Sequence, residues 1–442
     1  MSTPKRPNII WFMVDQMRGQ ATGANGDPNV FTPNLDNMAV CGTNFPGAVS
    51  GYPLCCPCRA SMLTARYAHN HSVKCHEDRL DPSYETVTDV FNQNDYETIY
   101  LGKWHLAGMK EAKGRTALNT VPRDERGRFD TWLGYENNNS QWDCYLHGHD
   151  GDDEVEHCKL PGYETDCLTD MALERIESRK EDDRPFFMVV SVQPPHWPSL
   201  APAENRRYQA QQLELRPNVP STLEAQARFD LSGYYAQIEN IDNNVGRIME
   251  SLQRTDQIDD THVLFFSDHG DQMGSHGRFG KCVPYEESAR VPFLIGGGKP
   301  MRYDGWQCGN APSLVNHVDI APTSLGLCGI DTPDWMEGFD YSHRRTGHNL
   351  KERLEAEPES AYLQLIGQRE SGYPWRCVVT RDGWKYACVE NGEWLLINLN
   401  EDPYEQNNLA FNPAYHAKRE EMKALLVNWM EKTGDSFPVP QG

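Results

Sequence analysis

The sequence lacks an apolar run of about 18 residues, the length that a helix needs to cross a membrane. Its first residues, Met1 to Asn8, also lack the apolar core of a signal peptide and lead directly into an apolar segment. These absences predict a protein with no membrane partner and a cytoplasmic location. They leave open an export signal that was trimmed away.

A disulfide framework is also missing. The chain has 13 cysteines, which is an odd number, and they are scattered without the regular spacing of a disulfide-rich secreted domain. This pattern favours free thiols in a reducing compartment, in agreement with a cytoplasmic location.

Positive charge is scarce. Lys and Arg total 42 against 64 Asp and Glu, so the net charge is −22. Nucleic-acid binding needs a basic face, and this balance argues against it. It also argues against long-range attraction of polyanionic polymers. A small anion held by a local group of cations fits better.

Repeats and low-complexity tracts are absent, and 442 residues suffice for a large core. Continuous apolar runs are typical of buried parallel strands. We expect such strands at Ile9–Val14, Glu97–Leu101, Phe186–Val192, Val263–Phe266 and Val291–Ile295. Helices are expected at Asn34–Val40, Cys58–Ala65, Asp166–Ser178, Thr222–Leu252 and His317–Leu327. The predicted fold class is α/β, with a large, mostly parallel sheet sandwiched by helices.

The pattern changes near residue 345. Short, hairpin-spaced strands are expected at Tyr362–Ile366, Arg376–Thr380, Lys385–Val389 and Trp394–Leu399, and a helix follows Asn412-Pro413. We therefore expect a catalytic α/β domain over residues 1–345 and a small C-terminal subdomain over 346–442, an antiparallel sheet plus a helix. Residues 110–165 are polar and rich in Gly, Asp and Asn, which predicts a long loop over the functional site.

A cysteine cluster is the most informative motif. Cys55-Cys56-Pro57-Cys58-Arg59 is followed by Leu63-Thr64-Ala65-Arg66. Cys55 and Cys58 have the spacing of a redox or zinc-binding pair. A zinc site needs a second ligand pair, and none lies nearby in the sequence. A thioredoxin-like site belongs in a small domain of roughly 100 residues.

Acidic residues follow two predicted strands. Asp15 and Gln16 come after the first strand, and Asp268 and His269 come after the strand at Val263–Phe266. An Asp in such a place also serves as a turn former or a helix cap. Because ligands of open α/β sheets bind beyond the carboxyl ends of strands, the two pairs can also converge on one hard divalent cation.

Cationic and imidazole side chains follow other strands. Lys103 and His105 lie in Gly102-Lys103-Trp104-His105, His196 and Trp197 lie in Pro195-His196-Trp197-Pro198, and Lys281 follows Gly280. Fixed cations stabilise the charge that develops on a transferred oxyanion, and a histidine can exchange a proton with a leaving group. Taken singly, each is more often a solvated or structural residue. The role of His276 stays open.

Together these motifs resemble the type I, formylglycine-dependent sulfatases of the alkaline phosphatase superfamily. The family carries Cys-x-Pro-x-Arg followed by Leu-Thr-x-Arg, and the resemblance extends from Asn8 to Leu409. It implies that a formylglycine-generating maturase oxidises Cys55 to formylglycine, and that the substrate is a small-molecule sulfate ester. One departure is Cys58, where the family usually has Ser, Ala or another small residue.

The resemblance also implies the roles of the site residues. Asp15, Gln16, Asp268, His269 and position 55 would hold a metal, Ca²⁺ by majority and Mn²⁺ as the alternative. Arg59 and Lys103 would hold the nucleophile, and Lys281 the sulfate. The hydrated aldehyde would attack sulfur, His196 or Lys281 would protonate the leaving alcohol, and His105 would assist the release of sulfate.

The alcohol part of the substrate is predicted from composition. Aromatic, amide and imidazole side chains suit a sulfated monosaccharide or short oligosaccharide. The residues expected to bind it are Trp197, His147, His149 and Arg376, within a wider set of Asn137, Asn138, Asn139, Trp142, Asp150, Arg369, Glu370 and Trp375. Two alternatives stay open: a phosphonate monoester or phosphodiester hydrolase of the same superfamily, and a sulfated-glycan binder without activity. The sequence does not determine the oligomeric state.

Overall fold

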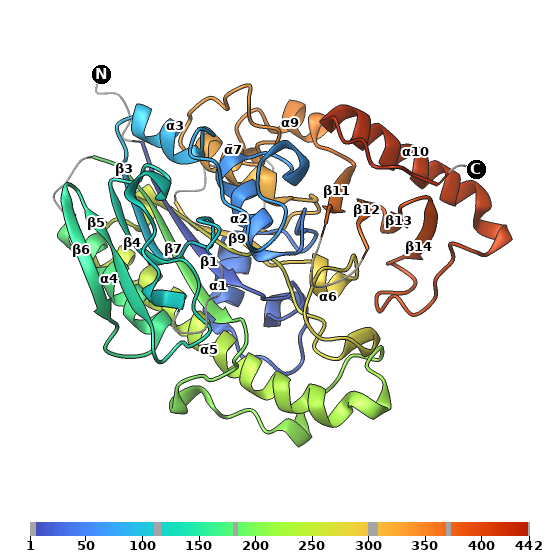
Figure 1. Cartoon of the computed structure of the whole chain (residues 1–442), viewed down its shortest axis with the longest axis horizontal. Coiled ribbons are helices and arrows are strands. Elements are labelled where there is room, and N and C mark those ends of the chain that lie inside the picture. The colour runs from blue at the N-terminus through green and yellow to red at the C-terminus, as the bar shows by residue number, and fades with distance from the viewer. Residues whose placement is uncertain (1–5, 110–115, 180–183, 299–307, 368–372, 441–442) are drawn as a thin grey trace.

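A ten-stranded sheet runs through the middle of the molecule (Figure 1). The computed structural model describes residues 6–109, 116–179, 184–298, 308–367 and 373–440, so Arg369 and Glu370 lie outside the described residues. The strand order is β10-β2-β9-β8-β1-β7-β3-β4-β5-β6. Its centre is parallel and comprises β8 (Thr261–Ser267), β1 (Asn8–Asp15), β7 (Phe186–Pro195), β3 (Glu97–Lys103) and β4 (Thr131–Tyr135).

Both faces of this sheet are buried, which explains the continuous apolar runs. In β1, Ile9, Trp11 and Met13 face one core and Ile10, Phe12 and Val14 face the other. The first core contains side chains of α2 (Cys55–Thr64), α3 (Val87–Gln93) and α7 (Ile320–Leu327). The second contains side chains of α1 (Pro33–Cys41), α4 (Glu164–Ser178) and α5 (Glu224–Arg254). The predicted α/β sandwich is confirmed.

The sheet is longer than the sequence indicated, and the loop predicted over residues 110–165 is wrong in part. This stretch contains β4, β5 (Tyr145–Asp150) and β6 (Asp153–Lys159), and β5 and β6 pair antiparallel at one end of the sheet. At the other end, β9 (Phe293–Gly297), β2 (Thr43–Asn44) and β10 (Gly309–Asn310) complete it. The strand predicted at Val291–Ile295 corresponds to β9, but it pairs antiparallel with β8 and β2. Pairing with a neighbour, rather than apolar composition, forms the other edge strands, β2, β5, β6 and β10.

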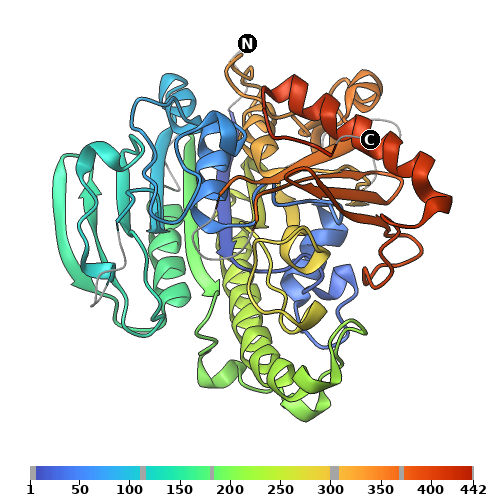
Figure 2. The same ribbon diagram turned by 45° about the vertical axis from the view of Figure 1, so that its right-hand side comes forward.

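The C-terminal sheet is antiparallel, as predicted, and lies on one side of the molecule (Figure 2). It comprises β11 (Ser360–Leu365), β12 (Trp375–Thr380), β13 (Trp384–Val389) and β14 (Gly392–Asn398), and α10 (His416–Thr433) packs on it. The boundary expected at 345 falls inside α8 (His343–Thr346) and precedes α9 (Leu350–Ala356). Tyr52 and Leu54 share a core with β11 to β14, and the division into two domains stays a prediction.

The structure also bears on the predicted absence of membrane-spanning helices and of disulfides. Among the described residues, no helix combines the length and the apolar character of a membrane span. The cysteines of the described residues form no disulfide. The cytoplasmic location stays a prediction.

Glu357 connects the two parts of the chain. Its buried carboxylate accepts hydrogen bonds from Arg344 at 2.6 and 2.7 Å and from Arg381 at 3.2 Å, and it contacts His343 at 2.7 Å. Burial raises the pKa of Glu357, but the bonds to His343 and Arg344 outweigh burial and lower it to about 2.

We expect Glu357→Gln to lower the free energy of unfolding by about 3 kcal/mol at neutral pH, because the partly buried guanidinium group of Arg344 loses its carboxylate partner. Since the folded-state pKa lies below the ordinary 4.5, this stabilisation is full above pH 4.5 and is lost as the pH falls towards 2. Urea unfolding at several pH values measures it. Glu359→Gln is the control, because that side chain is 80% exposed and should change little.

Candidate active site

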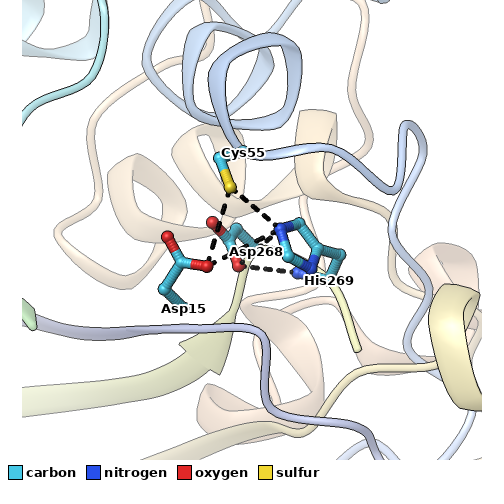
Figure 3. Close-up of side chains that lie close together, drawn as sticks. All are labelled: Asp15, Cys55, Asp268 and His269. Carbon is cyan, nitrogen blue, oxygen red and sulfur yellow. Dashed lines mark hydrogen bonds and ion pairs between the residues drawn. The ribbon is translucent and has the colours of Figure 1, made fainter. Parts of the chain in front are cut away.

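Four side chains from three distant segments meet at the carboxyl ends of the central strands (Figure 3). Asp15 is the last residue of β1, Asp268 and His269 follow β8, and Cys55 is the first residue of α2. Cys55 Sγ lies 3.1 Å from His269 Nε2 and 3.6 Å from Asp15 Oδ1. The ligand atoms of all four residues lie within 4.8 Å of one another.

This cluster has the donors of a cation site. Two carboxylates, one imidazole and one sulfur converge, and all four residues are buried. Asp268 Oδ2 has no hydrogen-bond partner. Burial and the neighbouring Asp15 raise the pKa of Asp268, which shows that the site disfavours two bare carboxylates. A divalent cation would remove that repulsion, so the residues fit a metal.

Arg59 and Lys103 neutralise the same carboxylates from the other side. Arg59 Nη2 lies 3.2 Å from Asp15 Oδ2, and its Nε lies 3.4 Å from Asp268 Oδ2. Lys103 Nζ donates to Asp15 Oδ2 at 2.8 Å. Lys103 ends β3 directly after Gly102, where a Cβ would lie 2.2 Å from the Ser191 carbonyl oxygen. Only glycine allows this close approach of β3 and β7.

Lys281 reaches the cysteine from the loop after β8. Its Nζ lies 3.0 Å from Cys55 Sγ and 3.0 Å from Gln16 Oε1. Gln16 has a φ of 73°, a left-handed conformation that is uncommon for a residue with a side chain. Its backbone N–H donates to Asp268 Oδ1 at 3.0 Å, so Gln16 joins the two acidic segments.

A cavity of about 380 Å³ opens above Cys55. It is lined by Cys55, His76, Glu77, Lys103, His105, Met109, Asn137, Asn139, His196 and Lys281. His105 follows β3 with a φ of 59°, which turns its side chain back towards the cavity. A thiol at the base of a cation-lined cavity, beside a cation site, is the arrangement that the sequence predicted for cleavage of an oxyanion ester.

Comparisons with known proteins agree with this geometry. Residues 7–330 match the family model described as Sulfatase, and residues 274–432 match the model described as N-sulphoglucosamine sulphohydrolase, C-terminal. The chain belongs to the sulfatase family. The family resemblance predicted from the cysteine motif is thereby confirmed, and this sulfatase is a hydrolase of sulfuric esters.

Individual relatives cover nearly the whole chain. An ulvan-active sulfatase of Formosa agariphila is 34% identical over 98% of this chain and 83% of its own length. An arylsulfatase of Clostridium perfringens is 28% identical over 98% of this chain and 96% of its own length. A solved sulfatase structure from Bacteroides fragilis, named yidJ, superposes with a TM-score of 0.87, with 26% identity over 99% of this chain and 98% of the other.

Electrostatics set the protonation of the site. Burial raises the pKa of the Cys55 thiol, but Lys281, His269 and Lys103 outweigh burial and hold that pKa well below its ordinary value. Cys55 also begins α2, and the positive end of a helix favours an anion there. The position is therefore built to hold a negatively charged atom.

Two of the three histidines that line the cavity, His105 and His196, are neutral in this environment. Burial, followed by Lys103, lowers the pKa of His105 to about 3. Burial, followed by Lys281, lowers the pKa of His196 to about 3. Burial lowers the pKa of Lys281, but Cys55, Asp15 and Asp268 outweigh burial and raise it, so Lys281 keeps its proton.

The structure does not bring the four residues predicted to bind the alcohol into the cavity. His147 and His149 lie in β5, where His147 accepts from the Val121 N–H at 2.8 Å and His149 contacts the Phe129 carbonyl at 3.0 Å. Arg376 is buried in β12 against Asp435. Trp197 is 64% exposed beside His196 and does not line the cavity. For His147, His149 and Arg376, structural hydrogen bonds replace the predicted substrate contact.

Only some residues of the wider set predicted to bind the sugar line the cavity. Asn137 and Asn139 line the cavity, whereas Trp375 is buried and donates to the Cys282 carbonyl at 3.0 Å. His276 stacks on Tyr285 with ring centroids 3.9 Å apart, a contact that fits a packing role in the Lys281 loop.

Sequence reasoning missed His76, Glu77 and Met109, which line the cavity. The ring of His76 stacks on that of His105 with centroids 5.5 Å apart. No local motif marks these three residues. His76 and Glu77 lie in the chain after the cysteine helix, and Met109 lies in the segment after β3, beyond His105.

Proposed function

We propose that this sulfatase removes sulfate from a sulfated monosaccharide or short oligosaccharide, with formylglycine at position 55 and a bound Ca²⁺, or alternatively Mn²⁺. The observation that carries the proposal is the cavity above Cys55. Lys103 and Lys281 lie near the cysteine, and apart from Met109 the other side chains of the wall are polar. The name of the ulvan-active relative supports a carbohydrate substrate.

The metal would be held by Asp15, Gln16, Asp268, His269 and the residue at position 55. Four of these five form the cluster already described. When bound, the cation would polarise a sulfate oxygen and favour an ionised nucleophile. The aldehyde, after hydration, would supply the attacking oxygen where Cys55 Sγ now lies. The proposal therefore also includes a maturase that converts Cys55 to this aldehyde.

The other side chains would bind and move protons. Lys103 and Arg59 fix the position of the nucleophile through Asp15. Lys281 binds the sulfate group and, because it keeps its proton, can donate one to the leaving alkoxide. His105 is neutral and can accept a proton when sulfate departs. His196 is neutral here and becomes a donor once a bound sulfate raises its pKa.

The substrate class is tested by a panel of sulfated sugars, an aryl sulfate, a phosphonate monoester and a phosphodiester, with sulfate or alcohol release as the readout. We expect the largest kcat/KM on a sulfated sugar. The second candidate function, phosphonate monoester or phosphodiester hydrolysis, is favoured by His269 in the metal cluster. Faster cleavage of a monoanionic phosphodiester would support it. Binding of a sulfated sugar without release of sulfate would support the remaining alternative, a sulfated-glycan binder without activity.

Glu77 is expected to select against a second negative charge on the substrate. It is the one carboxylate among the described residues that line the cavity. We expect Glu77→Gln to raise kcat/KM for disulfated relative to monosulfated sugars by roughly three- to tenfold, because a like charge near the sugar is removed. Glu85→Gln is the matched control, since Glu85 is exposed and does not line the cavity. An unchanged ratio contradicts the assignment.

A further inference from the structure

A second cavity, of about 350 Å³, lies next to the segment that follows β1. Its wall includes Arg18 and Gln20 from that segment, Arg216 from the chain before α5, and Tyr404 from the turn after β14. No described residue lines both this cavity and the one above Cys55. It is therefore a separate site, and the sulfatase chemistry does not use it.

Arg18 is the unusual residue of this wall. It is 3% exposed, its Nη2 donates to the Tyr235 hydroxyl at 3.0 Å, and its Nε has no hydrogen-bond partner. Within the described part of the chain Arg18 forms no ion pair, and Tyr235 donates a hydrogen bond to Asp27 at 2.8 Å. Burial lowers the pKa of Arg18, but nearby groups that include Tyr235, Asp27 and Glu287 outweigh burial and raise it, so the guanidinium stays charged. A buried charge without a direct partner is costly. An oxyanion in the cavity would supply that partner.

The two other guanidinium groups of the wall are already paired. Arg216 Nε donates to Glu287 at 2.7 Å, and Arg290 pairs with Glu286. Neither competes for the ligand that Arg18 requires. Gln20 lines the same cavity, and its side-chain oxygen has no hydrogen-bond partner.

A neighbouring cavity of about 330 Å³ shares the lining residues Pro28 and Asn29 with the first. Phe31 lies in this second part, 52% exposed, with the Arg207 guanidinium 4.4 Å from its ring centroid. Tyr208 and Gln212 complete the wall. We call the two cavities together the Arg18 groove. The wall also carries the carboxylates of Asp27, Glu214 and Glu286, and Arg18 is the guanidinium of the first cavity that forms no ion pair with a described carboxylate. Aromatic faces beside this cation are suited to a chain of sugar rings that carries a negative group.

We propose that the Arg18 groove binds an oligosaccharide that carries a carboxylate or sulfate group, with this group at Arg18 and its sugar rings against the aromatic side chains of Phe31 and Tyr404. The binding is noncovalent and independent of turnover. It would hold a longer glycan on the surface of the enzyme while another part of that glycan enters the catalytic cavity. The proposal goes beyond sulfate-ester hydrolysis and does not rest on it.

The test is isothermal titration of full-length protein carrying Cys55→Ala, which prevents turnover. The probes are three oligosaccharides of equal length: neutral, carboxylated without sulfate, and sulfated. We expect either anionic probe or both to bind at least roughly tenfold more tightly than the neutral one, and Arg18→Gln to lower that affinity by roughly ten- to a hundredfold. The probe that binds identifies the anion. Because the carboxylated probe has no sulfate, failure of the catalytic proposal would not affect its result.

Arg18 is buried and its replacement could unfold the chain, so Tyr404→Ala provides an independent test. Tyr404 is partly exposed and stacks on Arg216, with the guanidinium 4.8 Å from the ring centroid. We expect it to lower affinity for the anionic probe by roughly fivefold, whereas Phe411→Ala, an exposed aromatic outside both cavities, leaves it unchanged. With Cys55 intact, Tyr404→Ala should leave kcat on an aryl sulfate unchanged. The proposal is overturned if anionic and neutral probes bind alike, or if Tyr404→Ala has no effect.

Discussion

Replacing Cys55 by alanine is expected to lower kcat for sulfate-ester hydrolysis by at least about 10³-fold, because it removes the precursor of the nucleophile. The protein should remain folded, since the change deletes a single sulfur atom at the base of a cavity. Release of sulfate, measured by ion chromatography alongside circular dichroism, tests both parts.

Mass spectrometry of the peptide containing position 55 shows whether Cys55 has been converted to the aldehyde. Conversion of the thiol to an aldehyde lowers the mass by about 18 Da. Turnover should increase with the fraction of protein that shows this loss. Full activity of protein that carries only cysteine at 55 would contradict the mechanism and favour a metal-dependent phosphodiesterase.

Cys56→Ala is the matched control. Cys56 is the adjacent buried thiol, it packs in the core beneath the sheet, and burial raises its pKa well above the ordinary value. Cys56 is thus the neighbour of Cys55 in the same motif, but its surroundings raise the pKa of the thiol, whereas those of Cys55 lower it. We expect this variant to retain the mass loss at 55 and most of the activity, so that an effect limited to Cys55 identifies the nucleophile.

Removal of the metal should have the second large effect. Chelation is expected to lower kcat by about 10³-fold, because the developing charge on sulfate loses a divalent cation and two buried carboxylates are left to repel each other. Asp268→Asn should have a similar effect on turnover and should lower the bound metal, measured by atomic emission, to well below one ion per chain.

Reconstitution decides between the two candidate ions. Oxygen ligands favour Ca²⁺, and the imidazole of His269 favours a transition metal such as Mn²⁺. Recovery of activity with one ion and not the other identifies it. Asp81→Asn, an exposed carboxylate outside the cluster, should leave metal content and turnover unchanged. Retention of full activity after complete removal of divalent ions would show that the cluster is structural.

The extended sheet edge and the cavity wall show where sequence reasoning failed. The strands β5 and β6 arise in a Gly- and Asp-rich stretch, because pairing with β4 compensates for their weak intrinsic preference. His147 and His149 have the right side chains for a sugar site, yet their strand carries them into hydrogen bonds with the chain itself. Residue type alone does not distinguish a buried histidine with a backbone partner from one that meets a substrate.

The sequence by itself determined the family, the α/β class and the residues expected at the reaction centre, because a short cysteine motif and polar residues directly after apolar strands are local features. Only the tertiary structure decided which side chains share a cavity. Cys55 and His269 are 214 positions apart, and their 3.1 Å contact depends on the order of strands in the sheet. His76, Glu77 and the unpaired Arg18 became visible only there, since burial and the absence of a partner are properties of the whole packed chain.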